Sequence, residues 1–532
     1  MSQLLHELLL RQAGQTPQAT ALVHRDAKYS YEQVASEVEQ FGRAMVARGL
    51  RVQDRVAVFL PKQLETVVTM FGAARAGLTF VPVNPILKAP QVRHILGDCD
   101  VRVLVTSPER YATLERDLVE CPALDCVVLV GSGSDAVVQP SAPRRCALVT
   151  WSETLRSAPA SAAFHRIVDM DMLSILYTSG STGRPKGVVL SHRNMVTGAH
   201  SVAQYLENTP DDRLLAVLPF SFDYGFSQLS TAFSVGASVV LMDYLFARDI
   251  LTVAQRERVT GLAGVPPLWA QLADLEWPAE VRESLRYITN SGGAMPGATL
   301  AKLRSALPKT RPFLMYGLTE AFRSTFLPPS EIDNRPGSMG KAIPNAEILV
   351  VRPDGTPCEP DEAGELVHRG SLVSLGYWND PQKTAERFKP APGRPGGLVI
   401  PEIAVWSGDT VRKDEDGYLY FVGRRDEMIK TSGYRVSPTE IEEIVFATGL
   451  IADAAAVGVP HPTLGQAVAL VVAGTQSPGA STALLNECKK QLPAYMVPAH
   501  IDWREAIPRN ANGKYDRALL ARELSSLFAA QK

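Results

Sequence analysis

Apolar residues follow two different spacings through about the first 400 residues. The run Arg55 to Leu60 is short, mostly apolar and rich in valine, as in a buried strand, and the segment from Glu65 to Gly77 that follows it has a helical pattern. Similar strand-like runs alternate with helical segments along this whole part of the chain. This alternation predicts a mainly parallel sheet covered by helices, and therefore an α/β fold.

The pattern changes near residue 426. A strand-like run from Gly417 to Gly423 leads into the charged Arg424-Arg425-Asp426-Glu427. Beyond it, Ser437 can cap a helix that starts with Pro438 and carries Glu440 three residues after the cap. Alternating residues from Ala467 to Ala473 predict a strand in the same region.

These patterns predict two domains. Residues 1–425 form a large N-terminal domain of layered sheets and helices, and residues 426–532 form a small, mobile α+β domain of about one hundred residues. The segment from Gly131 to Arg145 is rich in Gly, Ser and Pro and is expected to be an exposed loop of the large domain.

Composition excludes several classes of protein. The formal net charge of the 532 residues is −2 and 21% are charged, which gives no electrostatic footprint for nucleic acid. No apolar run is long enough to span a bilayer, and the amphipathic start of the chain does not resemble a signal peptide. The six cysteines form no CxxC pair, so we expect reduced thiols in a cytoplasmic protein with no zinc site.

A loop suited to polyphosphate follows the strand-like run Leu173 to Leu176. Glycines let the backbone approach an anion, hydroxyls and amides donate to phosphate oxygens, and a lysine supplies positive charge. The Walker pattern does not match, because the lysine follows Pro185 and precedes Gly187, and a plain flexible turn is the alternative. The candidate nucleotide-binding residues in this loop are Thr178, Ser179, Gly180, Ser181, Thr182, Gly183 and Lys186.

This loop resembles the signature of adenylate-forming enzymes, which include acyl-CoA synthetases, nonribosomal-peptide adenylation domains and luciferases. The resemblance continues through the rest of the chain in the order that the family shows. Its segments are Tyr177 to Gly187, Asn290 to Pro296, Tyr316 to Glu320, Trp406 to Asp409, Gly423 to Asp426, Leu492 to Pro498 and Pro508 to Arg517.

The resemblance implies catalytic roles for three residues. Lys514 matches the family's lysine that bridges the substrate carboxylate and the α-phosphate of ATP, two anions that need positive charge between them. Glu320 resembles the glutamate that binds Mg²⁺, and Thr319 resembles the hydroxyl that contacts the α-phosphate. Taken alone, Lys514 would be interpreted as a solvated lysine after a turn.

The resemblance also implies contacts to the rest of ATP. Tyr316 resembles the aromatic residue that stacks on adenine, and Gly292, Gly293 and Ala294 resemble the backbone strip beside the purine. Asp409 matches the carboxylate that accepts both ribose hydroxyls, and Arg424 matches a nucleotide contact next to it. A core tyrosine and a turn-forming aspartate are the alternatives for Tyr316 and Asp409.

Two further residues are implied in a change of domain arrangement. Asp426 aligns with the family's hinge, although a salt-bridged surface aspartate is the alternative. One arrangement would bring Lys514 to the acid for adenylation, and the other would open a tunnel near Gly433 for a pantetheine thiol.

The segment Leu218 to Ser227 corresponds to the entrance of the family's acid pocket. Phe222 and Asp223 resemble peptide-synthetase domains, where the aspartate binds the α-ammonium of an amino acid, and a buried carboxylate needs such a cation. The alternative is that Asp223 caps a helix from Tyr224. Arg323 could bind a second acidic group on the substrate, but we expect it to pair at the surface.

The sequence therefore predicts an AMP-forming ligase that uses ATP and Mg²⁺, acts on a carboxylic acid with a preference for amino acids, and passes the acyl group to a thiol. That thiol belongs to CoA or to the phosphopantetheine of a separate carrier protein. A fatty- or short-chain acyl-CoA synthetase without amine recognition is the main alternative. A silent nucleotide sensor would be expected to lack Lys514 or Glu320, and nothing in the sequence favours a luciferase-like oxygenase.

Overall fold

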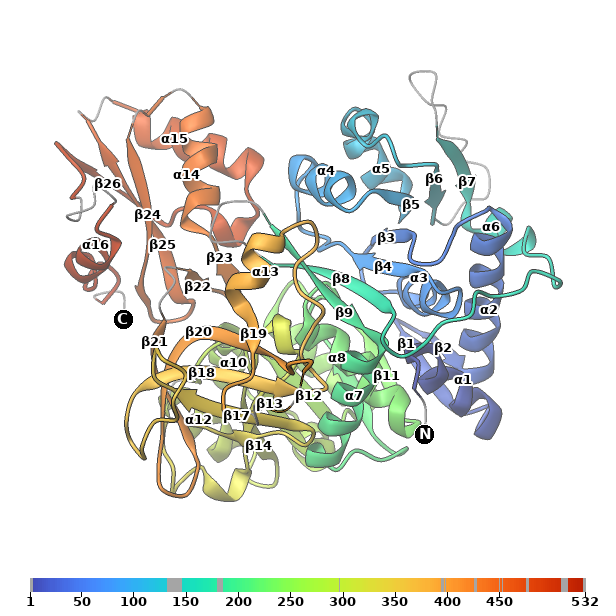
Figure 1. The fold of residues 1–532 in the computed structure, drawn as a ribbon, viewed down its shortest axis with the longest axis horizontal. Helices are drawn as coiled ribbons and strands as arrows, with labels where there is room; N and C mark the ends of the chain where they lie inside the picture. The colour runs from blue at the N-terminus through green and yellow to red at the C-terminus, as the bar shows by residue number, and fades with distance from the viewer. Residues whose placement is uncertain are drawn as a thin grey trace.

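The computed structural model describes residues 3–131, 146–178, 185–295, 297–393, 397, 399–424, 428–448, 450–451, 453–474, 478–508 and 515–529. Within them the strands form three sheets, two large ones in the first part of the chain and a smaller one near its C-terminal end (Figure 1). Helices and strands are both abundant, and the predicted α/β class is confirmed.

The seven-stranded sheet is parallel apart from its last strand, β9, which runs antiparallel to β8. Its β3 and α3 correspond to the strand and helix predicted from the first apolar runs. In the order of the sheet, its strands are β7 (Ala147–Thr150), β6 (Cys126–Leu129), β5 (Val101–Thr106), β3 (Arg55–Phe59), β4 (Thr79–Pro82), β8 (Met172–Thr178) and β9 (Lys186–Ser191).

The second sheet joins a parallel part to an antiparallel part. From β1 to β14 neighbouring strands are parallel, and from β14 onwards they are antiparallel. In sheet order the strands are β17 (Ala346–Val351), β18 (Gly364–Gly370), β20 (Ile403–Lys413), β21 (Leu419–Arg424), β16 (Ser338–Ala342), β15 (Thr325–Leu327), β14 (Arg311–Tyr316), β13 (Tyr287–Asn290), β12 (Gly261–Gly264), β10 (Arg213–Ala216), β11 (Ser238–Leu241), β1 (Thr20–His24) and β2 (Ala27–Ser30), and β19 (Phe388–Pro390) pairs with β20.

Helices fill the space between and around these sheets. Helix α3 packs on the seven-stranded sheet, α8 packs on the second sheet, and α1 contacts both helices. The α-helices of this part are α1 (Leu5–Gln15), α2 (Tyr31–Ala47), α3 (Leu64–Arg75), α4 (Ala89–Asp98), α5 (Pro108–Leu114), α6 (Trp151–Arg156), α7 (His192–Leu206), α8 (Asp223–Val235), α9 (Ala247–Glu257), α10 (Pro266–Ala273), α11 (Ala279–Ser284), α12 (Gly297–Ala306) and α13 (Pro381–Arg387). Short 3-10 turns are η1 (Asp117–Glu120), η2 (Thr319–Ala321) and η3 (Pro329–Glu331).

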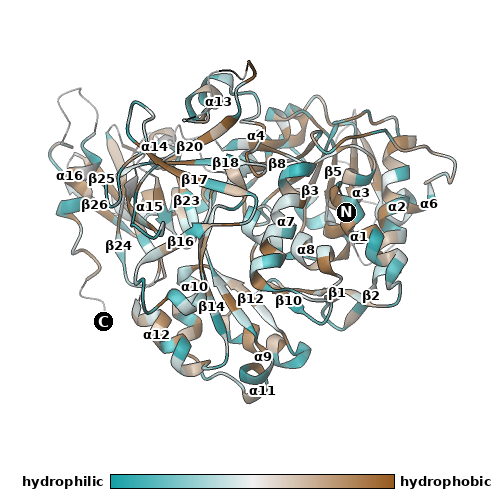
Figure 2. Ribbon diagram, turned by 60° about the horizontal axis from the view of Figure 1, so that its bottom comes forward, coloured by the Kyte–Doolittle hydropathy of each residue, from teal (hydrophilic) through white to brown (hydrophobic). Residues whose placement is uncertain are grey.

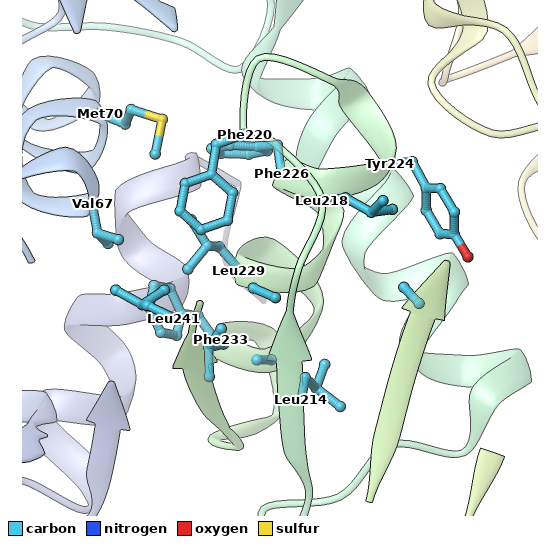
Figure 3. Close-up of a cluster of buried hydrophobic side chains, with 14 of the residues drawn as sticks. Val67, Met70, Leu214, Leu218, Phe220, Tyr224, Phe226, Leu229, Phe233 and Leu241 are labelled. Carbon is cyan, nitrogen blue, oxygen red and sulfur yellow. The ribbon is translucent and has the colours of Figure 1, made fainter. Parts of the chain in front are cut away.

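An aromatic cluster ties the two large sheets together. Phe71 of α3 stacks on Phe226 of α8 with ring centroids 6.3 Å apart and meets Phe233 edge-on at 5.2 Å. Phe80 of β4 stacks on the same Phe226 ring at 5.3 Å. Figure 3 shows Phe226 in this cluster with Val67 and Met70, whereas Tyr224 lies apart from them. Fully buried rings of this kind hold α8 rigidly, and the candidate acid-binding residues stand at its N-terminus.

The C-terminal sheet has helices on both faces. Alternate residues of β24 face opposite ways: Ala454 and Ala456 pack in one apolar cluster with α14 and α15, while Ala455 and Val457 pack in another with α16. Its elements are β22 (Ile429–Thr431), β23 (Tyr434–Val436), α14 (Pro438–Ala447), β24 (Ala454–His461), β25 (Gly465–Ala473), α15 (Ala480–Gln491), η4 (Ala494–Met496), β26 (His500–Arg504) and α16 (Arg517–Glu523). The boundary at Asp426 lies outside the described residues and stays a prediction.

The predicted start of α14 is right in position and wrong in its capping contact. Ser437 stands at the N-cap with Pro438 after it, but the hydroxyl of Ser437 makes no capping hydrogen bond. Glu440 accepts a hydrogen bond of 3.1 Å from Gln91 of the large domain.

Hydropathy along the chain agrees with this layering. Helices α1 and α2 carry both hydrophilic and hydrophobic positions, as expected for helices with one covered face (Figure 2). No helix among the described residues is long and apolar enough to cross a membrane.

The six cysteines are free, as predicted, and burial raises the pKa of Cys99 to about 12.

Two buried histidines generate a test of this packing. His192, at the start of α7, accepts a 3.0 Å hydrogen bond at Nδ1 from the backbone N–H of Leu5, and its ring lies 6.2 Å from that of His6. Burial lowers the pKa of His192 to about 4 and that of His6 to about 3. Both rings are therefore neutral in the folded protein at pH values where the unfolded chain is already protonated.

We expect acid to destabilise the fold through these rings. Because the folded pKa values lie below the unfolded value of about 6.5, stability is complete above that pH and falls by about 1.4 kcal/mol per pH unit for each histidine as pH drops from 6.5 towards 4. His192→Gln keeps an acceptor for Leu5 but cannot be protonated, so its thermal midpoint should fall less steeply over this range. His500→Gln on β26 is the control, and equal slopes for wild type and His192→Gln would contradict the account.

Candidate functional site

The carboxyl ends of the parallel strands form one edge of the second sheet. In the register of β13 and β14, Asn290 pairs with Leu314, so the segments that follow these two strands leave the sheet side by side. The first segment contains Gly292, Gly293 and Ala294, and the second contains Thr319 and Glu320. In open α/β sheets ligands bind in the crevice at this edge.

A polar cavity lies beside the second of these segments. Glu320 reaches it, and its Oε1 accepts a 2.6 Å hydrogen bond from the Tyr377 hydroxyl. The Nζ atom of Lys186 lies 5.5 Å from the centre of the same Tyr377 ring. Burial lowers the pKa of Lys186, as does the nearby Lys383, while Glu320 acts against them. The cavity therefore brings a cation and a carboxylate from distant segments together, as a site for phosphates and a metal ion requires.

Asp409 also lines this cavity, and Tyr316 contacts it. The Tyr316 hydroxyl donates a 2.5 Å hydrogen bond to Asp409 Oδ2, and burial raises the pKa of Tyr316 well above its usual value. Asp409 is 5% exposed, and its backbone N–H donates to the hydroxyl of Ser407 at 3.0 Å. The backbone of Arg424 pairs with Asp409 across β20 and β21, so three predicted nucleotide contacts lie together.

Two glycines with left-handed backbones lie where the C-terminal sheet meets this edge. Gly292 has φ of +80° and Gly433 has φ of +81°, a left-handed conformation that favours glycine. A Cβ at Gly292 would lie 3.5 Å from the carbonyl oxygen of Gly433, and a Cβ at Gly433 would lie 2.8 Å from the side chain of Val265. Gly433 precedes β23 in the β22–β23 hairpin, whose tip therefore fits against the large domain.

A second cavity of about 140 Å³ holds the predicted acid-binding residues. Phe222 and Asp223 line it, and Asp223 is 4% exposed. Burial raises the pKa of Asp223, while the charge of Arg323 acts in the opposite direction. Helix α8 starts at Asp223, and Phe222 occupies the N-cap position, so the interpretation of Asp223 as a capping residue is wrong.

Arg323 corrects another expectation. Instead of pairing at the surface, its side chain is 2% exposed and lines the same cavity as Asp223. Its Nη1 atom lies 3.9 Å from Asp223 Oδ2, and its guanidinium lies over the Tyr224 ring at 4.4 Å. The 3-10 turn η2, which carries Glu320, lies between β14 and the antiparallel strand β15. The residue types in this segment did not predict that turn.

The two cavities share three lining residues, Thr178, Leu318 and Arg435. Thr178 ends β8 and pairs with Lys186 at the start of β9, so both ends of the predicted phosphate loop reach the polar cavity. Arg435 comes from β23 of the C-terminal sheet and was not predicted. The sequence signal that could have identified Arg435 is its position two residues after Gly433. No local sequence pattern indicated that Tyr377 would line the site.

A third cavity, of about 380 Å³, adjoins the acid cavity. The two cavities share Phe222, Gly433 and Tyr434, and Arg110 lines the larger one. Tyr434 is stacked on Tyr495 with ring centroids 3.9 Å apart. Gly433 thus lines a cavity between the two parts of the chain, while the tunnel expected near it in a second domain arrangement stays a prediction.

Several predicted residues fall outside the description. These are Ser179, Gly180, Ser181, Thr182, Gly183, Asp426 and Lys514, together with the side chain of Arg424. Among the described residues no three His, Cys, Asp or Glu side chains cluster as a metal site would require. Glu320 is the one predicted metal ligand, which suits a cation whose other ligands are phosphates and water.

Comparison with known proteins identifies the family. Residues 9–378 match the AMP-binding enzyme family, and residues 440–514 match the AMP-binding enzyme C-terminal domain. The chain is 29% identical to the L-proline--[L-prolyl-carrier protein] ligase of Pseudomonas fluorescens, over 98% of this chain and 99% of the relative. It is 31% identical to the indoleacetate--CoA ligase of Aromatoleum aromaticum, over 96% of each.

Other relatives are much longer or are known in three dimensions. The chain spans 10% and 6% of two linear gramicidin synthase subunits of Brevibacillus parabrevis, at 28% identity. The structure of o-succinylbenzoate CoA synthetase from Bacillus subtilis superposes with a TM-score of 0.81 at 25% identity, covering 97% of each chain. The predicted resemblance to adenylate-forming enzymes is confirmed, and the chain belongs to the AMP-binding enzyme family.

Proposed function

We propose that this chain is an AMP-forming acid–thiol ligase, which activates a carboxylic acid with ATP and transfers the acyl group to a pantetheine thiol. The observation that carries this proposal is the meeting of the polar cavity and the acid cavity at Thr178, Leu318 and Arg435. An acid in one cavity and a nucleotide in the other would meet at these residues, as attack of a carboxylate on an α-phosphate requires.

The polar cavity suits the predicted parts of ATP. Asp409 would accept the two ribose hydroxyls, and Tyr316, beside it, would stack on adenine along the Gly292–Ala294 backbone. Lys186 and the loop 179–183 would bind the outer phosphates, and Thr319 the α-phosphate. When bound, Mg²⁺ neutralises charge on the phosphates, and Glu320 is the residue that would hold it.

Positive charge at the junction is what the first half-reaction needs. The carboxylate oxygen attacks the α-phosphorus, the bond to the bridging oxygen of pyrophosphate breaks, and acyl-AMP and pyrophosphate are formed. Charge moves from the acid towards pyrophosphate, so cations on both sides lower the barrier. Lys186, which lines the polar cavity, would supply positive charge on the phosphate side, and Lys514 is the predicted bridge between carboxylate and α-phosphate.

The third cavity suits the second half-reaction. A thiol must reach the acyl carbon from the side opposite AMP, and a cavity that shares Phe222 and Gly433 with the acid cavity would give it a path. Attack of the thiol breaks the bond from the acyl carbon to the AMP oxygen and leaves a thioester and AMP. CoA and the phosphopantetheine of a separate carrier protein carry the same thiol arm, so both fit.

The acid cavity favours a polar acid over a fatty acid. Asp223 and Arg323 are charged side chains in its wall, and a hydrocarbon chain beside them would leave both without solvent or a ligand. An amino acid supplies an ammonium group for Asp223, as predicted. A cytoplasmic location is part of this proposal and awaits its own test.

The reaction is tested by its products. Purified chain with ATP, Mg²⁺ and a panel of amino, aryl, short-chain and fatty acids should release pyrophosphate with some of the acids. Addition of CoA or of a phosphopantetheinylated carrier protein should then increase AMP release and form a thioester. ATP turnover that is independent of every acid would contradict the proposal.

Lys514 provides a test of the two half-reactions. Lys514→Ala should lower acid-dependent pyrophosphate release by roughly two to three orders of magnitude, because one well-placed charge is lost from the transition state. Conversion of preformed acyl-AMP to thioester should be affected much less. If preformed acyl-AMP is used as poorly as free acid and ATP, the bridging role is wrong.

Substitution of Gly433 tests whether the tip of the β22–β23 hairpin must lie against the large domain. Gly433→Ala puts a methyl group 2.8 Å from Val265 and a non-glycine residue at φ of +81°, so the hairpin tip should move away from the large domain. We expect thioester formation from acyl-AMP to fall by roughly tenfold or more, with a smaller loss of pyrophosphate release.

The matched control for this variant is Gly479→Ala. Gly479 has the same φ of +81°, but a Cβ there meets nothing within 4 Å. It carries the backbone penalty without the contact to the large domain. Equal effects of the two variants on the thioester step would show that only local stability had changed.

A further inference from the structure

Arg323 is buried with much of its hydrogen-bonding capacity unused. A guanidinium has five N–H donors, and buried donors are normally paired. The Nε atom of Arg323 has no hydrogen-bond partner among the described residues. Its closest charged partner, Asp223 Oδ2, is 3.9 Å from Nη1, beyond hydrogen-bond length. A buried cation in this state indicates a ligand.

The backbone before Arg323 is strained. Phe322 has φ of +52° and ψ of −45°, and the N–H of Arg323 donates to the carbonyl of Ala321 at 2.5 Å, which closes a tight three-residue turn. Such γ-turns are rare, and residues held in them cluster at ligand sites. The Phe322 ring fits only because residue 198 is glycine, where a Cβ would lie 2.3 Å from it.

Tyr224 supports the guanidinium from one side. Arg323 lies over its ring at 4.4 Å, and the Tyr224 hydroxyl is fixed by a 2.5 Å hydrogen bond with Thr289 Oγ1. A guanidinium held on a ring still directs its N–H groups within its own plane. Arg323 can therefore donate to a ligand in the cavity without leaving its place.

Asp223 is also loosely paired. Its Oδ1 atom lies 3.5 Å from the hydroxyl of Thr319, at the limit of a hydrogen bond, and Glu320 adds a second negative charge nearby. The cavity wall thus presents a buried cation whose Nε atom has no partner among the described residues, and a buried anion. The partners of that anion are a hydroxyl at the limit of a hydrogen bond and the backbone N–H of Tyr224. Both groups face the same space.

We propose that the acid bound here is an amino-dicarboxylic acid, whose ammonium group pairs with Asp223 and whose non-reacting carboxylate pairs with Arg323. This inference rests on the ligase function proposed above and names the substrate class of the same site. The third group, the reacting carboxylate, points to the junction with the nucleotide cavity at Thr178 and Arg435.

Charge matching separates this class from its neighbours. A simple amino acid satisfies Asp223 and leaves Arg323 alone, while a dicarboxylic acid without an amine adds a further anion next to Asp223 and Glu320. A monocarboxylic acid with an uncharged side chain gives neither Asp223 nor Arg323 a partner of opposite charge. Only the amino-dicarboxylic acid gives each of them an opposite charge, and an uncompensated buried charge is costly.

Acid-dependent ATP–pyrophosphate exchange with the full chain tests the inference. The probes are L-aspartate and L-glutamate, their analogues without the amine (succinate and glutarate), their analogues without one carboxylate (β-alanine, L-alanine, 4-aminobutyrate and L-2-aminobutyrate), and the neutral acids propionate, butyrate, octanoate and benzoate. An amino-dicarboxylic acid should have the highest kcat/KM, roughly a hundredfold above its matched analogues.

Substitutions of Arg323 and Asp223 test which group of the substrate pairs with each of these two side chains. Arg323→Gln should abolish the preference for the second carboxylate and keep that for the amine, and Asp223→Asn should do the reverse. Arg323→Lys should restore part of the preference for the second carboxylate, which a merely structural role would not do. Thermal midpoints check folding, and calorimetric titration of the wild type with L-aspartate and L-glutamate in the presence of a non-hydrolysable ATP analogue tests binding without turnover.

The outcomes distinguish the two levels of the proposal. Fastest exchange with a neutral acid or a simple amino acid would overturn the substrate class and leave the ligase function standing. An unchanged preference in Arg323→Gln would also overturn it. Absence of exchange with every probe, together with no binding, would contradict both.

Discussion

Two anions have to react at this site, and that constraint explains most of its construction. A carboxylate and a triphosphate repel each other in water, so the protein must surround their meeting point with positive charge and exclude solvent. The polar cavity brings Glu320 and Asp409 together from separate segments of the second sheet, and Lys186 arrives from the other sheet. Arg435 comes from the C-terminal sheet. The number of positively charged side chains at the site therefore depends on how the two parts of the chain pack against each other.

The acid cavity is held by a rigid scaffold. Helix α8 is packed between the two large sheets by Phe71, Phe80 and Phe226, so Asp223 at its start cannot easily move towards Arg323. Arg323 is held in turn by the strained turn at Phe322. The separation of 3.9 Å between the two charges is therefore a property of the scaffold, which keeps both groups available to a ligand.

The sequence predicted those elements and site residues that local patterns or ordered motifs indicate. Periodicity indicated β3, α3 and α14. The family resemblance indicated Asp409 and Glu320, which line one cavity, and Tyr316, which bonds to Asp409. It could not predict contacts that depend on tertiary packing. Arg323 was expected at the surface because arginine usually is, and Ser437 was expected to cap α14 through its hydroxyl, which makes no such bond.

The most direct test of the account follows one oxygen atom. Acid labelled with ¹⁸O in its carboxylate should be converted to thioester in the presence of ATP, Mg²⁺ and CoA or a carrier protein, and mass spectrometry of the products shows where the label goes. If the carboxylate attacks the α-phosphate, each AMP carries one ¹⁸O atom and pyrophosphate carries none. Label in phosphate or pyrophosphate, or thioester formed with unlabelled AMP, would contradict an acyl-adenylate intermediate.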